Sequence, residues 1–225
     1  MVEIIHKTKN YVVIKKPSGI PSQKDNSGDK DAMTLTAELL ASLGESSALW
    51  LVHRLDRNVG GLLVFARNQR YAARLSEAVR DREISKEYLA VVDGEPVGGE
   101  MVDMLYKDSR IGKAFVVDKG KPSAKEARLS YRALGNAVTE RGTKTLVAIA
   151  LDTGRFHQIR AQFSSRGFPL TGDGKYGSKD KGGEGIALFA FGLMLPTEEG
   201  VSFSSLPDVT KYPWCLFDEK IYRSL

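Results

Sequence analysis

The sequence predicts an α+β protein, formed as a single compact domain with a central, mostly antiparallel or mixed β-sheet flanked by helices and loops. Segments with the composition of strands outnumber amphipathic helical segments. Strands and helices alternate strictly along the chain in proteins with a parallel sheet, and the segments expected here do not. A length of 225 residues, of which 42% are hydrophobic, suits one domain with one sizeable core.

The first part of the chain contains two expected strands and two expected helices. The strands are continuous β-branched, aromatic or apolar runs, and the helices carry apolar residues at helical spacing. Lys16-Pro17-Ser18-Gly19 ends the first strand and opens a polar loop, and Gly44 is a stop signal after the first helix. The expected strands are residues 11–14 and 62–66, and the expected helices are residues 33–43 and 69–82.

The rest of the chain is rich in β-structure. Segments of high β-propensity follow one another, separated by turns rich in glycine and lysine, and one segment returns to helical spacing before Gly167-Phe168-Pro169 stops it. The expected strands are residues 87–92, 114–117, 125–133, 145–151 and 186–195, and the expected helix is residues 155–166.

Composition narrows the possible functions only slightly. A net charge of +5 and a pI near 9.2 favour an anionic partner such as nucleic acid, although a soluble surface of ordinary make-up would give the same excess. Cys215 is the only cysteine, so no internal disulfide is expected, and no Cys/His cluster has metal-ligand spacing. Neither a secretion signal nor a membrane helix is expected, and a cytoplasmic setting fits.

The densest polar cluster in an apolar setting is His53-Arg54-Leu55-Asp56-Arg57. It lies between the apolar residues 49–52 and the expected strand at residues 62–66. One interpretation is a solvated turn in which Asp56 pairs with a neighbouring arginine, which would stabilise the protein little. The other is a functional carboxylate among basic groups.

Arg160 lies close to the apolar face of the expected helix at residues 155–166, about 40° from Phe156 at helical spacing. Burying an arginine costs several kcal/mol unless acceptors complete its hydrogen bonds, so we expect Arg160 to be partly buried against a carboxylate. Asp56 is the candidate partner and Asp152 is the local rival. A purely structural ion pair would follow from the same reasoning.

Tyr88 stands where the charged segment Ser85-Lys86-Glu87 gives way to an expected strand. Its ring could point into a cleft, where it would meet a ligand, or into the core, where most strand tyrosines lie.

At these places the chain resembles the RluA family of pseudouridine synthases. Residues 53–66, which begin His-Arg-Leu-Asp, resemble the HRLD signature of the family and the apolar strand that follows it. Residues 152–160, which end His-Gln-Ile-Arg, and the later Gly172-Asp173 are similar to a second family segment. Weaker matches are Lys16–Gly19, Ser85–Gly94 and Ala124–Ala127. The resemblance implies a single catalytic domain at residues 1–225, without a separate N-terminal RNA-binding domain.

The resemblance also implies roles for individual residues. Asp56 is expected to act at the ribose, either as a nucleophile at C1′ or as the base that starts a glycal route. Arg160 is expected to keep Asp56 ionised, and Tyr88 to lie beneath the target base. Arg54 is expected to fill the space left by a flipped uridine, with His53 contacting phosphate or fixing the loop. Further candidates for backbone contact are Lys15, Lys16, Arg57 and Arg67.

The expected substrate is structured RNA, either ribosomal or transfer RNA, and the expected state is a monomer. The family's reaction requires no metal, nucleotide or redox cofactor. Two other classes stay open: a non-catalytic RNA-binding or ribosome-assembly factor on the same fold, and a nucleoside hydrolase. A hydrolase would need a second, water-activating carboxylate near the first, and no such pair is seen around Asp56.

Overall fold

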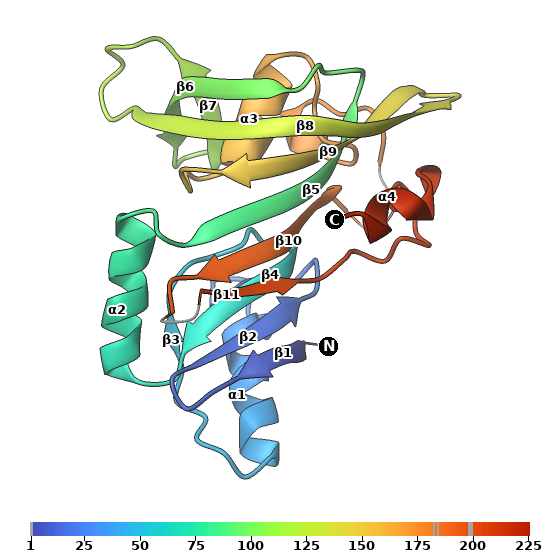
Figure 1. Cartoon of the computed structure of the whole chain (residues 1–225). Coiled ribbons are helices and arrows are strands. Elements are labelled where there is room, and N and C mark those ends of the chain that lie inside the picture. The colour runs from blue at the N-terminus through green and yellow to red at the C-terminus, as the bar shows by residue number, and fades with distance from the viewer. Residues whose placement is uncertain (1, 182, 184, 198–199) are drawn as a thin grey trace. The chain divides into compact units, whose positions relative to one another are not determined.

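The structure is a computed structural model that describes residues 2–181, 183, 185–197 and 200–225 (Figure 1). Its contacts divide the chain into two compact units. Unit 1 comprises the residues up to 85 together with 190–207, and unit 2 comprises residues 86–189 and 208–225. Among the helices formed by the described residues, none has the length and hydrophobicity of a transmembrane segment.

Unit 1 is built on a sheet. Its strands are β1 (Glu3–Lys7), β2 (Tyr11–Lys16), β3 (Trp50–Leu51), β4 (Gly60–Ala66), residues 190–195 of β10 (Leu188–Leu195), and β11 (Val201–Ser204). They follow the order β1, β2, β4, β10, with β3 paired to β4 and β11 paired to β10. β2 is antiparallel to both β1 and β4. Every residue of β4 is buried, as its continuous apolar sequence predicts.

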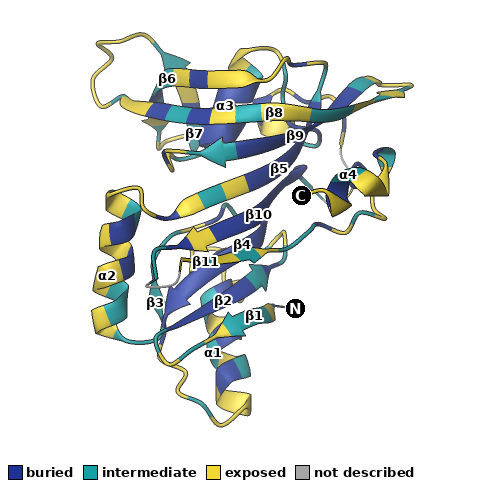
Figure 2. Cartoon of the chain, viewed as in Figure 1, coloured by how far each residue is buried: buried dark blue, intermediate teal, exposed yellow. Residues whose placement is uncertain are grey.

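The two helices of unit 1 begin at side-chain caps. The carboxylate of Asp31 accepts a hydrogen bond from the amide of Thr34 at the start of α1 (Ala32–Ser42), and Asn68 does the same for α2 (Gln69–Arg80). α2 buries one side and exposes the other (Figure 2). Its Leu75 and Ala78 pack into a core that includes residues of β2, β4 and β10.

Gly61 at the start of β4 occupies a position that requires a glycine. Its φ of +117° is a conformation that other residues rarely adopt, and a Cβ atom at this position would come within 2.2 Å of the carbonyl oxygen of Ala190 in β10. Gly61 therefore allows β4 to pack closely against β10 at its start, directly after residues 53–59.

Unit 2 is built on five antiparallel strands in the order β5, β9, β8, β6, β7. Their bounds are β5 (Ser85–Asp93), β6 (Gly99–Asp108), β7 (Lys113–Val117), β8 (Lys125–Thr139) and β9 (Gly142–Leu151). The other elements are α3 (Gln158–Ser165), η1 (Gly174–Tyr176), η2 (Trp214–Leu216) and α4 (Glu219–Arg223). α3 packs on the sheet, where Phe163 meets the ring of Tyr131 edge-on at 4.9 Å.

The predicted α+β class is confirmed, and most predicted elements lie close to their observed positions. The sequence does not predict the strands β1, β3, β6 and β11. The helix predicted from residue 155 begins at residue 158, because His157 takes a left-handed conformation with φ 52° and ψ 28° at the N-cap of α3. The three residues before the helix therefore form a turn.

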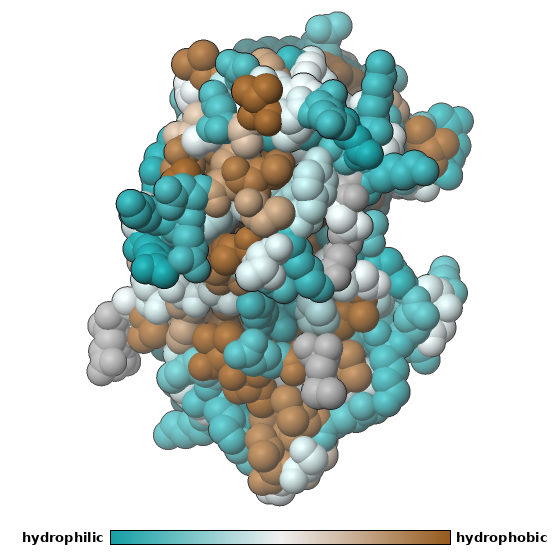
Figure 3. Space-filling model, turned by 90° about the vertical axis from the view of Figure 1, so that its right-hand side faces the viewer, coloured by the Kyte–Doolittle hydropathy of each residue, from teal (hydrophilic) through white to brown (hydrophobic). Residues whose placement is uncertain are grey.

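Hydrophobic residues also occur at the surface. On the face shown in Figure 3, several hydrophobic residues adjoin one another, with hydrophilic residues on both sides of them. Val97 and Val138 are the most exposed of the large hydrophobic residues among those described. Single exposed side chains of this kind are normal in soluble proteins.

Candidate active site

Asp56 lies in a turn between β3 and β4 of unit 1 and is partly exposed. The buried side chains of Leu55 and Val59 anchor the turn on either side. The amide of Val59 donates to the carbonyl oxygen of Asp56 at 3.0 Å, which closes the turn. The carboxylate therefore projects from backbone that is fixed by local packing.

The segment after β2 holds the rest of this turn. The hydroxyl of Ser22 donates to the carbonyl oxygen of Leu55 at 2.8 Å and accepts from the amide of the same residue at 3.0 Å. The amide of Gly19 donates to the carbonyl oxygen of Arg57 at 2.9 Å, and the hydroxyl of Ser18 donates to that of Asn58 at 2.9 Å. All four carbonyl groups of residues 55–58 thus accept hydrogen bonds.

Lys16 is fully buried beneath this turn, with an exposed fraction of 0%. Its ammonium donates to the carbonyl oxygens of Pro17 at 2.9 Å, Ile20 at 2.8 Å and Arg57 at 3.1 Å. Burial lowers the pKa of Lys16 to about 7, against the opposing effect of the negative charge of Asp56. The prediction that Lys16 contacts the RNA backbone is wrong, because a buried ammonium cannot reach a phosphate outside the protein.

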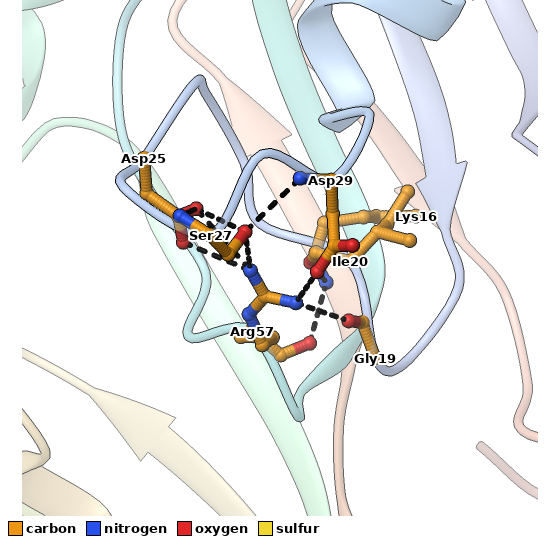
Figure 4. Close-up of polar contacts among 7 residues, drawn as sticks. All are labelled: Lys16, Gly19, Ile20, Asp25, Ser27, Asp29 and Arg57. Atoms are coloured by element: carbon orange, nitrogen blue, oxygen red, sulfur yellow. Dashed lines mark hydrogen bonds and ion pairs between the residues drawn. The ribbon is translucent and has the colours of Figure 1, made fainter.

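Arg57 ties a second part of the same segment to the turn (Figure 4). The terminal nitrogen Nη1 of its guanidinium donates to Asp29 at 2.5 Å. The second terminal nitrogen, Nη2, donates to Asp25 at 3.1 Å and also to the hydroxyl of Ser27. The hydroxyl and amide of Ser27, followed by Arg57, lower the pKa of Asp25 to about 2. Arg57 is partly exposed, so a contact with RNA stays a prediction.

Lys15 and Arg67 are also predicted to contact the RNA backbone. In the structure, both side chains bind residues of unit 1. The ammonium of Lys15 donates to the carbonyl oxygen of Leu206 at 2.8 Å. The guanidinium of Arg67 donates to the carbonyl oxygen of Thr8 at 2.8 Å and pairs with Glu45 at 2.9 Å. Binding to RNA would have to compete with these contacts.

His53 and Arg54 precede Asp56. The ring nitrogen Nε2 of His53 accepts a hydrogen bond from the amide of Val64 at 3.4 Å, so this histidine helps to hold the turn against β4. This contact agrees with the predicted role of His53 in fixing the loop. Its contact with an RNA phosphate stays a prediction. Arg54 is exposed, as an arginine that stacks on bases must be.

Tyr88 is buried in β5 of unit 2, with 7% of its surface exposed. It lies opposite Ile149 of β9, which in turn lies opposite Tyr131 of β8. Residues opposite one another in antiparallel strands share a face, and Tyr131 packs against Phe163 of α3. Tyr88 therefore belongs to the face of the sheet that α3 covers.

Arg160 is buried in α3, with 6% of its surface exposed, as its position near the apolar face predicts. It pairs in a fork with Asp173, from Nε at 2.7 Å and from a terminal nitrogen at 2.9 Å. No ion pair joins it to Asp152 in the part of the chain that the structure describes, so that rival is excluded. Pairing with Asp56, which belongs to unit 1, stays a prediction.

Asp173 is a partner of Arg160 that the sequence does not predict, although Gly172-Asp173 belongs to the second family segment. It follows α3 in the Gly172-Asp173 pair, 13 residues after Arg160, and it is buried. The ring of Tyr176, three residues later, lies 4.8 Å from the guanidinium carbon of Arg160. A carboxylate on one side and an aromatic ring on another fix the orientation of the arginine.

His157 is a second residue near Arg160 that the sequence does not predict to be functional. Its Nδ1 lies 3.0 Å from the hydroxyl of Tyr176, which also accepts from the amide of Ala114 at 2.8 Å. Burial first, and then the charge of Arg160, lower the pKa of His157 to about 3. We assign its proton to Nε2, because the tyrosine hydroxyl can donate to Nδ1. In the sequence, only its position within residues 152–160 marks this histidine.

The described residues contain no group of three or more His, Cys, Asp or Glu side chains that could hold a metal ion. The predicted site residues fall in both units: Asp56, His53, Arg54 and Arg57 in unit 1, and Tyr88 and Arg160 in unit 2. Within the units, the structure offers a fixed carboxylate and an oriented, buried arginine.

Comparison with known proteins gives consistent results. A family model described as RNA pseudouridylate synthase matches residues 10–165. The chain is 29% identical, over 99% of its length, to ribosomal large subunit pseudouridine synthase D of Borreliella burgdorferi, and covers 69% of that protein. It is 31% identical, over 83% of its length, to the Yersinia pestis protein of the same name, and covers 56% of it.

Among solved structures, the human protein described as RNA pseudouridylate synthase domain containing 4 matches with a TM-score of 0.74 and 26% identity. The match covers 92% of this chain and 89% of the human one. The chain spans 57% of another curated relative, ribosomal large subunit pseudouridine synthase D of Zymomonas mobilis, so it corresponds to part of the length of these bacterial proteins.

Proposed function

The chain belongs to the RNA pseudouridylate synthase family, and we propose that it isomerises uridine in RNA to pseudouridine with Asp56 as the essential carboxylate. The observation that carries this proposal is the fixed turn around Asp56, in which all four carbonyl groups of residues 55–58 accept hydrogen bonds. A reacting carboxylate must be held in place in this way.

The reaction conserves all atoms of the substrate. The bond between N1 and C1′ breaks, the uracil turns within the site, and a bond between C5 and C1′ forms, while C5 loses a proton and N1 gains one. Asp56 can serve as the nucleophile at C1′ or as the base that starts a glycal route. Because the product is an isomer, no external oxidant, reductant or group donor is consumed.

Arg160 and Tyr88 are proposed to act with Asp56. An arginine whose orientation is fixed by Asp173 and Tyr176 is suited to hold a second carboxylate ionised through a charge-assisted hydrogen bond. The ring of Tyr88 is proposed to lie beneath the uracil and to help the C5 proton leave. These two roles rest on the family's motifs.

Arg54 is proposed to enter the space left when the uridine leaves its stack. Extruding a stacked base costs a few kcal/mol, and a planar guanidinium can stack in its place while contacting phosphate. Arg54 is exposed two residues before Asp56, which supports this role. His53 and Arg57 are proposed to support the turn and to add contacts with the RNA backbone.

The substrate is proposed to be structured RNA, ribosomal or transfer. The names of the relatives from Borreliella burgdorferi and Yersinia pestis favour RNA of the large ribosomal subunit. A monomeric state and a cytoplasmic location belong to the same proposal.

Tritium release from a large-subunit rRNA transcript labelled at uracil C5 tests the proposed activity. We expect the parent protein to release tritium and Asp56→Asn to reduce release to background, because the amide keeps the size of the side chain but loses the anion. The variant should still retain RNA on a filter. The control is Asp118→Asn, which neutralises an exposed carboxylate in unit 2.

Substantial release from Asp56→Asn would remove Asp56 from its role. A second result would be that the parent binds RNA but releases no tritium, either from the rRNA transcript or from labelled total RNA. That result would favour the alternative of a non-catalytic RNA-binding factor. Loss of free uracil from the RNA would instead indicate hydrolysis, since isomerisation leaves the RNA mass unchanged.

A further inference from the structure

Lys86 is a partly buried cation at the start of β5, two residues before Tyr88. Side chains alternate between the faces of a strand, so Lys86 and Tyr88 point to the same face. Tyr88 lies in register with Ile149 and Tyr131, and Tyr131 packs on Phe163 of α3. Lys86 therefore lies on the face of the unit 2 sheet that α3 covers.

The ammonium of Lys86 lies against the turn that leads into α3. A Cβ atom built on Gly154 would lie 3.6 Å from the Lys86 Nζ atom, so the ammonium lies next to this glycine. The amide oxygen of Gln158 fixes this turn, accepting from the hydroxyl of Thr153 at 2.7 Å and from the amide of Arg155 at 3.0 Å. The position of the ammonium is thus bounded by rigid backbone.

Other buried cations of unit 2 are paired. Lys144 lies 2.6 Å from Asp93 and 3.0 Å from Asp180, and Arg160 is held by Asp173. Among the described residues, Lys86 has neither a hydrogen bond nor an ion pair, and its burial lowers the pKa of the ammonium with no opposing anion. Partial burial of a charge without a partner costs free energy.

We propose that Lys86 binds a phosphate group of the RNA next to the target uridine, and so positions that nucleotide over Tyr88. This inference rests on the proposed function. RNA supplies the anion that the described part of the chain does not supply, and a lysine ammonium binds a single phosphate as a compact point charge. Lys86 is a positioning residue in this account, because it contacts the backbone of the substrate and takes no part in bond exchange.

The test compares Lys86→Met and Lys86→Arg with the parent, using the C5-tritiated large-subunit rRNA transcript. Met keeps the apolar stem and removes the charge, and Arg keeps the charge. Lys220→Met in α4 is the matched control, because it removes one exposed charge from the same unit. Steady-state tritium release is measured over a range of salt concentrations, and unfolding by urea is measured without RNA.

For Lys86→Met we expect a KM about 10-fold higher with kcat changed less than about 3-fold, the scale of one lost hydrogen bond to a charged group. The slope of log kcat/KM against log salt should become shallower by about one counterion. Lys86→Arg should restore most of both effects. Without RNA, Lys86→Met should be at least as stable as the parent, because an unpaired charge has been removed.

An unchanged KM and salt slope in Lys86→Met would overturn the proposal. A loss of stability with a parallel loss of activity would also overturn it and show a structural role. If the parent released no tritium, the proposed function would fail on its own. RNA retention on filters over the same salt range would then decide whether Lys86 contributes a phosphate contact.

Discussion

Two opposite effects act on the pKa of the buried Lys16 ammonium. Three carbonyl oxygens and the nearby Asp56 favour the charged ammonium, whereas complete burial disfavours it. The outcome is a pKa of about 7, so burial is the larger effect. In the unfolded chain the same ammonium keeps its ordinary pKa of 10.5. Folding therefore couples to proton release from Lys16 in mildly alkaline solution.

This difference predicts how stability changes with pH. Between about pH 7 and 9.5 the unfolded chain holds a proton on Lys16 that the folded protein has lost, so stability should rise with pH. The contribution is up to about 3 kcal/mol over that interval, at 1.36 kcal/mol for each pH unit. Urea unfolding of the parent at both pH values measures it.

Lys16→Met should lose this rise, whatever its stability at pH 7. Lys24→Met, which removes an exposed lysine from the same segment, should keep it. A parent and a Lys16→Met variant with the same pH dependence would show that Lys16 keeps its ordinary pKa in the folded protein.

At the scale of elements, β2 and the loop after it act on the turn that precedes β4. Lys16 ends β2, and Ser18, Gly19 and Ser22 follow in the loop, all bonded to residues 55–58. In the other direction, the side chain of Arg57 in the turn binds Asp25 and Asp29 further along the same loop (Figure 4). The loop and the turn thus hold each other, although they are far apart in sequence.

Replacing Arg57 should release the loop and leave the backbone bonds of the turn in place. In Arg57→Gln we expect faster hydrogen exchange in residues 23–30 without RNA, and a kcat lower by about 3- to 10-fold, because one of several contacts that fix the turn is lost. Exposed ion pairs contribute little to stability because water screens them, which sets this modest scale.

Arg70→Gln in α2 is the control for loss of an exposed arginine from unit 1. If exchange in the loop of Arg57→Gln stayed at the level of the parent while the salt dependence of RNA binding became shallower, Arg57 would be a phosphate contact and not a loop anchor.

At the scale of the whole molecule, the protein should modify a defined set of uridines in the cell. We expect mapping of pseudouridine in total RNA, with and without the protein, to show its sites in large-subunit rRNA, because that RNA is the proposed substrate. The same sites should be missing when Asp56→Asn replaces the parent. Sites confined to transfer RNA would contradict this choice of substrate.

Much of the architecture could be predicted because it depends on local patterns. The apolar run of β4 and the stripe of α2 report burial directly, and both elements formed where expected. β1 and β6 were missed because they mix charged and apolar residues, and such strands are stabilised mainly by the neighbours they pair with. The start of α3 was misplaced because the left-handed conformation of His157 has no pattern in the sequence.

The sequence by itself determined the fold class, the burial of Arg160 and the motif that contains Asp56, because these follow from periodicity and from residues close along the chain. Only the tertiary structure decided that Asp173, 13 residues away, pairs with Arg160, that Asp25, 32 residues away, pairs with Arg57, and that Lys16 is buried. The choice of an ionic partner depends on distance through space and on the surrounding solvent. Both arise only after strands and loops have packed.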